Sequence, residues 1–138
     1  MRRYQNIIDP ILERYPETQA VYLFGTYDTN WESQESDLDI AVLLPPDRAR
    51  QMNFRERFEI ADEISSVAKK EKVDLINLRL VDTVFQKEII FTGRRIYCAD
   101  EYAGDEFEML TLSLYQKLNE ERKDIIAEGI KSGRFYDV

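Results

Sequence analysis

The segment FGTYDTNWESQESDLDIAVLL, residues 24–44, joins two of the most apolar stretches of the chain through a polar loop. Its second apolar stretch, IAVLL, comes directly after the pair Asp37 and Asp39. Side chains alternate between the two faces of a strand, so a strand over residues 37–44 places both carboxylates on the same face. They are either solvated charges at a strand end or ligands held there to bind a cation.

Apolar periodicity predicts the elements on either side of this segment. Helices are expected over residues 4–15, 49–70, 82–93 and 101–131, and short strands over residues 20–24, 37–44, 73–78 and 95–98. Pro10 predicts a kink in the first helix or a helix that restarts there. The strands are continuously apolar, a pattern typical of strands buried on both faces. This order predicts an α/β (α+β) fold, a mixed sheet of about four strands covered by helices, with a long C-terminal helix.

The second predicted helix, residues 49–70, has an apolar side. That side is made of Phe54, Phe58, Ala61, Ile64 and Val67.

Length and composition predict one domain that spans residues 1–138, with a core over about residues 4–98 and a helix and tail over 101–138. The apolar runs are too short to cross a membrane, and the first residues do not resemble a signal peptide. Cys98 is the one cysteine. An internal disulfide is therefore impossible, and we expect a cytoplasmic protein.

The charge balance and the residue types that are missing narrow the possible chemistry. The chain carries 19 basic and 27 acidic residues, a net charge of −8, which disfavours direct binding to nucleic acid. It contains no histidine. This excludes the Ser-His-Asp triad and every zinc site that needs histidine. Any catalysis must therefore use carboxylates, lysine, tyrosine, hydroxyl groups or a hard metal ion.

A third acid and a glycine favour the ligand interpretation of Asp37 and Asp39. Asp74 begins another apolar strand, and if that strand pairs beside the first, three carboxylates meet where a divalent cation would relieve their repulsion. Gly25 and Thr26 end the preceding strand, where a glycine allows a tight turn and a hydroxyl can hold phosphate. The combination indicates metal-assisted phosphoryl or nucleotidyl transfer.

The spacing resembles a known signature. Gly25-Thr26, ten intervening residues and Asp37-Leu38-Asp39 are similar to the G-S, ten residues, D-x-D signature of the nucleotidyltransferase superfamily related to DNA polymerase beta. The resemblance extends over about residues 4–98, with VDLINL in the place of the third carboxylate. Since only one long helix follows, the chain resembles the minimal nucleotidyltransferases of the MntA type, antitoxins that accompany HEPN-domain toxins (HepT).

The resemblance implies an activity and a role for each residue. A relative of this kind would use ATP and Mg²⁺ to transfer AMP to a tyrosine of a HEPN-domain toxin, silencing an RNase. Asp37 and Asp39 would hold the metal ions, and Asp74 would ligate one of them and help to deprotonate the tyrosine. Gly25 and Thr26 would hold the triphosphate.

The loop itself departs from the family pattern, which leaves alternatives open. Family loops often continue G-S-x-A-R-G, whereas this one reads GTYDTNW, without the arginine or the second glycine. A non-catalytic antitoxin that acts by stoichiometric binding is one alternative. A small-molecule nucleotidyltransferase with a separate acceptor subunit is another. Trp31 either stacks on a base or closes the loop, and the tail 133–138 either binds a partner or folds back on its own domain.

Overall fold

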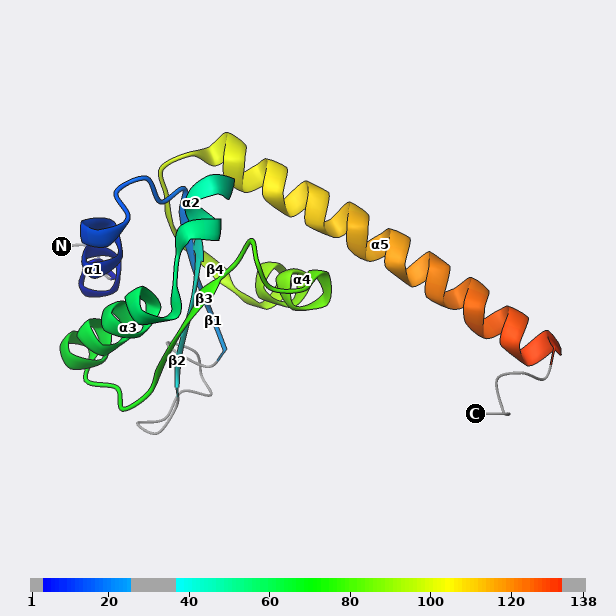
Figure 1. Ribbon diagram of the computed structural model, residues 1–138, viewed down its shortest axis with the longest axis horizontal. Coiled ribbons are helices and arrows are strands. Elements are labelled where there is room, and N and C mark those ends of the chain that lie inside the picture. Colours follow the sequence, from blue (N-terminus) through cyan, green and yellow to red (C-terminus); the bar gives the residue numbers. More distant parts are fainter. Residues whose placement is uncertain (1–3, 26–36, 133–138) are drawn as a thin grey trace.

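The computed structural model describes residues 4–25 and 37–132, with side chains as far as residue 128 (Figure 1). Thr26, the loop that contains Trp31, and the tail 133–138 lie outside the described residues. The elements are α1 (Gln5–Arg14), β1 (Ala20–Phe24), β2 (Leu38–Leu43), α2 (Pro46–Gln51), α3 (Phe54–Ala68), β3 (Val73–Asn77), α4 (Thr83–Thr92), β4 (Arg94–Cys98) and α5 (Glu101–Ser132).

The four strands form one mixed sheet, as the sequence predicts, in the order β3-β2-β1-β4. β1 runs antiparallel to both β2 and β4, whereas β2 and β3 run parallel. A parallel pair needs a crossover connection, which α2 and α3 provide. The parallel pair is what brings the start of β3 beside the start of β2.

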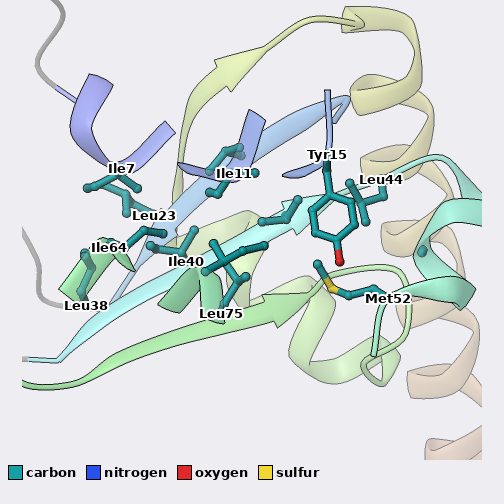
Figure 2. Packing of buried hydrophobic residues seen from close by; sticks show 14 residues of the cluster. Ile7, Ile11, Tyr15, Leu23, Leu38, Ile40, Leu44, Met52, Ile64 and Leu75 are labelled. Carbon is teal, nitrogen blue, oxygen red and sulfur yellow. The ribbon is translucent and has the colours of Figure 1, made fainter. Parts of the chain in front are cut away.

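Each face of the sheet carries its own buried cluster. One cluster lies under α1 and α3 and includes Leu38, Ile40 and Val42 from β2 (Figure 2). The other lies toward α4 and the first turns of α5 and includes Ala41 and Leu43 from the same strand. The two central strands, β1 and β2, are therefore buried on both faces, which confirms the interpretation of their continuous apolar sequence.

The prediction of a single helix over residues 49–70 is wrong, because the helix breaks at Asn53. The Asn53 side chain accepts a hydrogen bond from the Glu56 backbone N–H at 2.8 Å, and the Glu56 carboxylate accepts one from the Asn53 N–H at 3.4 Å. This reciprocal capping box starts α3 afresh. At Pro10 the helix does not restart, because α1 continues through that residue.

The predicted apolar side of α3 faces the core only in part, because Ile64 and Ala61 pack there and the two phenylalanines do not. Ile60 and Ile64 are fully buried, but Phe54 is 72% exposed and Phe58 62% exposed. Their rings stack on each other with centroids 6.4 Å apart. The helix therefore buries one row of side chains and leaves an aromatic pair at its beginning facing solvent.

Only the first turns of α5 dock on the body of the molecule. The Tyr22 hydroxyl donates to the Glu108 carboxylate at 2.6 Å, and Arg95 pairs with both Glu108 and Asp105. Phe107 is buried beside these groups. Thr111 is also buried, and the Tyr115 ring centroid lies 4.9 Å from the Lys87 ammonium of α4. Farther along, the helix leaves the sheet (Figure 1). The exposed apolar side chains of α5 include Met109, Leu110, Leu114, Leu118 and Ile125.

Burial of Tyr22 raises the pKa of its phenol, and the hydrogen bond to Glu108 raises it further.

No helix among residues 4–25 and 37–132 is both long and apolar enough to cross a membrane.

Ile40 gives a test of the central strand. Ile40→Ala should lower the free energy of unfolding by about 2–5 kcal/mol, because it leaves a cavity in a fully buried site of β2. The control Ile125→Ala removes the same atoms from a side chain that is 69% exposed. It should change the free energy of unfolding by less than about 0.5 kcal/mol. Urea denaturation followed by circular dichroism measures both. Equal losses in the two variants would contradict this account of the core.

Candidate active site

Three strands bring the predicted acidic residues and the glycine to one end of the sheet. Asp39 of β2 lies opposite Phe24 of β1 and in register with Asp74 of β3. Gly25 follows Phe24 directly, and Asp37 directly precedes β2. The structure therefore places Gly25 and Asp74 on either side of Asp39.

The face of the sheet on which Asp39 lies follows from its neighbours along β2. Ala41 belongs to the cluster toward α4, whereas Leu38 and Ile40 belong to the cluster under α1 and α3. Since side chains alternate, Asp39 shares the face of Ala41, and Asp74 shares the face of Ile76. Both aspartates thus lie on the side of the sheet that α4 covers, at its open end.

Gly25 lets the backbone come very close to the Asp39 carboxylate. Its φ is +77°, in the left-handed region that favours glycine. A Cβ atom at this position would lie 2.4 Å from Oδ2 of Asp39, well inside contact distance. The turn after β1 therefore requires glycine for two separate reasons, its backbone conformation and this approach.

The environment of Asp39 disfavours its charged form. Burial raises the pKa of its carboxyl group, and the charges of Asp74 and Asp37 raise it further. Lys72 acts in the opposite direction and lowers the pKa of Asp39. The Lys72 ammonium lies 3.7 Å from Oδ2 of Asp37, and both side chains are partly exposed. One lysine thus offsets part of the repulsion among three carboxylates.

The donor set suits a divalent cation, although the described residues hold no compact group of three acidic side chains arranged to hold a metal. Carboxylate oxygens are the ligands that hard cations prefer, and Asp39 and Asp74 already lie in register on one face. The raised pKa of Asp39 means that its charge is incompletely compensated by the protein alone. A divalent cation would supply the missing compensation.

The sequence did not single out Lys72 as part of this site. Read along the chain, it resembles the other lysines near the end of a helix. The register explains its position, because Leu38 pairs with Val73, which sets Lys72 beside Asp37 one residue earlier. Lys87 of α4 is another lysine whose position the structure defines. Its ammonium lies 4.8 Å from the ring centroid of Phe91 and 4.9 Å from that of Tyr115. It is a packing residue between α4 and α5.

A groove of about 360 Å³ lies between α3 and β3, and Asp74 is part of its lining. The remaining lining residues are Phe54, Arg57, Phe58, Ala61, Val73, Leu75 and Ile76. The predicted phosphate-binding residue Thr26 lies outside the described residues, so only its neighbour Gly25 is placed.

Known proteins resemble this chain in sequence and in structure. Residues 6–102 match the family described as polymerase beta, nucleotidyltransferase. The chain belongs to this family. The match includes Gly25 and all three aspartates, so the family assignment covers the whole candidate site.

Individual relatives are close in both sequence and structure. The protein adenylyltransferase MntA of Shewanella oneidensis is 34% identical over 121 residues, 87% of this chain and 82% of that protein. A crystal structure of a toxin–antitoxin with AMP-PNP superimposes with a TM-score of 0.77 at 30% identity, over 93% of this chain and 98% of that one. The MNT antitoxin in complex with the tri-AMPylated HEPN toxin of Shewanella oneidensis gives 0.71 at 30% identity, over 94% and 99%.

The nucleotidyltransferases of this family thus share their fold with this chain. The match covers 93% of the 138 residues of this chain and 98% of the solved chain. It must therefore include most of the 32 residues of α5.

Gly25→Ala should disturb Asp39. The added methyl group meets the Asp39 carboxylate and forces a left-handed backbone on alanine, which costs about 1–2 kcal/mol of stability. The control Gly104→Ala adds a methyl group that meets only the end of the flexible Arg95 side chain. We expect Gly25→Ala to weaken Mn²⁺ binding, measured by electron paramagnetic resonance, and Gly104→Ala to leave it unchanged. Unchanged binding in both variants would contradict the close approach.

Asp39→Asn should make the chain more stable at neutral pH when EDTA removes divalent cations. The pKa of Asp39 is raised in the folded state above its ordinary value of 3.8, so ionisation favours the unfolded chain. The destabilisation is absent below that ordinary pKa and grows as pH rises through the folded pKa. Urea denaturation from pH 3 to pH 7 should therefore show equal stabilities at low pH and an advantage for Asp39→Asn at pH 7. An advantage confined to low pH would reverse the sign and contradict the assignment.

Proposed function

We propose that this chain is an antitoxin that transfers AMP from ATP to a tyrosine of a HEPN-domain toxin. The observation that carries the proposal is the register that flanks Asp39 with Gly25 and Asp74, in a chain 34% identical to a protein adenylyltransferase. The solved relative in complex with a tri-AMPylated HEPN toxin supports the choice of partner. The solved toxin–antitoxin with AMP-PNP supports an adenine nucleotide as the substrate.

The reaction joins the tyrosine oxygen to the α-phosphorus of ATP. The bond between that phosphorus and the oxygen bridging to the β-phosphate breaks, and pyrophosphate leaves with the electron pair. The hydroxyl proton passes to a base and then to solvent. No residue of this chain is covalently modified in the scheme, so catalysis depends on position and charge.

The residues divide these tasks by their place in the sheet. The backbone at Gly25 approaches the triphosphate from the β1 side, and Thr26 adds its hydroxyl. Asp37 and Asp39 would hold the cation, for which we propose Mg²⁺; when bound, it would supply charge neutralisation on the phosphate oxygens. Asp74, on the β3 side, would share the cation and accept the proton of the incoming hydroxyl. Lys72 beside Asp37 compensates charge before the nucleotide arrives.

The absence of histidine is compatible with this assignment of roles. A carboxylate can accept the proton of the incoming hydroxyl in place of histidine, and in this assignment Asp74 does so. Burial and the charges of Asp74 and Asp37 disfavour the charged form of Asp39, so its role is the one that a bound cation would favour.

Labelling of the partner tests the proposal. The chain is incubated with Mg²⁺, α-labelled ATP and the product of the neighbouring reading frame, and label on that protein is the expected result. Asp37→Asn should lower the rate by more than about a hundredfold, since loss of groups that merely support a metal ligand costs 10–100-fold. The control Asp47→Asn alters a side chain that is 87% exposed and paired with Arg50, and should retain the rate.

One observation favours a second candidate, neutralisation by binding alone. α5 carries exposed apolar side chains well beyond its docked turns, including Leu114 at 52% and Ile125 at 69% exposure. A partner held there could be masked without catalysis. A tight complex without label would support this alternative and contradict AMP transfer, whereas label that disappears in Asp37→Asn while the complex persists would support AMP transfer.

A further inference from the structure

The groove beside β3 adjoins the candidate reaction centre on the side away from the glycine. In the order β3-β2-β1-β4, Gly25 follows β1 and Asp74 belongs to β3, with Asp39 of β2 between them. If phosphate groups lie against Gly25, the nucleotide occupies the β1 side. The β3 side, where Asp74 lines the groove, is then the direction from which the acceptor must come.

The lining of the groove suits an apolar segment of protein better than a nucleotide. Six of its eight lining residues are apolar, and the two charged ones, Arg57 and Asp74, have opposite signs. Phe54 and Phe58 stack at its wall and are 72% and 62% exposed. The Arg57 guanidinium lies 6.0 Å from the Phe54 ring centroid. Aromatic residues, phenylalanine among them, and arginine are enriched in protein interfaces.

The backbone of β3 gives the groove a second means of recognition. β3 is the last strand of the sheet, so its outer edge is unpaired among the described strands. The Leu38 N–H donates to the carbonyl of Lys72, and the Leu78 N–H donates to that of Val42, which sets residues 72, 74, 76 and 78 facing β2. By alternation, Val73 and Leu75 direct their N–H and C=O groups outward, along the groove that they line.

We propose that this groove binds the segment of the protein acceptor that carries the reacting hydroxyl, in extended conformation, with apolar side chains against Phe54 and Phe58. The segment pairs with the outer edge of β3 as an added strand and so brings its hydroxyl to Asp74. The inference rests on the proposed function, since it names where the acceptor of that reaction binds. Phe54 and Phe58 are positioning residues, because they contact the acceptor segment away from the reacting atoms.

The double variant Phe54→Ala/Phe58→Ala tests the groove with the partner HEPN-domain protein and α-labelled ATP. Both side chains are largely exposed, so the fold should tolerate their loss. The KM for the partner should rise at least about tenfold, with kcat changed by less than about threefold. The Kd for AMP-PNP, measured by calorimetry, should stay within about twofold. The control Phe91→Ala removes a ring of α4 that is 63% exposed, and should alter none of the three.

A second measurement is independent of turnover. With Phe58→p-benzoylphenylalanine, irradiation should cross-link the chain to partner residues within a few positions of the labelled hydroxyl, as identified by mass spectrometry.

The outcomes separate the two proposals. Label transfer by the original chain with an unchanged KM in the double variant would overturn the groove and leave the proposed function standing. Weaker AMP-PNP binding would overturn it in favour of a nucleobase site. Cross-links that map far from the labelled hydroxyl would also overturn it. No label with the original chain would overturn both proposals.

Discussion

The contact between the Gly25 backbone and the Asp39 carboxylate is the constraint on which the rest of the site depends. A side chain at position 25 would displace that carboxylate and would be strained at this positive φ, so the turn after β1 favours glycine. Asp39 is also partly buried, and burial is the largest cause of its raised pKa. Asp74 and Asp37 then add like charge to a group that is already poorly solvated. The structure thus holds Asp39 in a state that a bound cation would relieve.

Local sequence patterns were sufficient to predict the central strands and the acidic residues at the starts of β2 and β3. The continuous apolar runs predicted the two central strands, and the acids at the starts of β2 and β3 predicted which residues would meet. The spacing between Gly25 and Asp37 also predicted the family correctly. The break between α2 and α3 had a signal too, since Asn53 followed three residues later by Glu56 is a capping box. The long apolar periodicity around it concealed that signal.

Other features depend on how elements pack, and no pattern within one element reveals them. Phe54 and Phe58 share a helical side with Ile64, yet only Ile64 is buried, because β3 is the last strand of the sheet and, among the described residues, no further strand extends beside the start of α3. Lys72 looks like a helix-end charge until the parallel pairing sets it beside Asp37. In both cases the deciding fact is the strand order, which the sequence does not specify.

The parallel register of β2 and β3 also determines how a shift in the pairing of these strands would affect the site. Because side chains alternate, a shift of one residue between these strands would bring Val73 or Leu75 opposite Asp39 and turn Asp74 toward the other face. A shift of two would restore the face but move the carboxylate by about 7 Å. The register of β3 therefore decides whether Asp74 joins Asp37 and Asp39, which stay together at the start of β2 in any register.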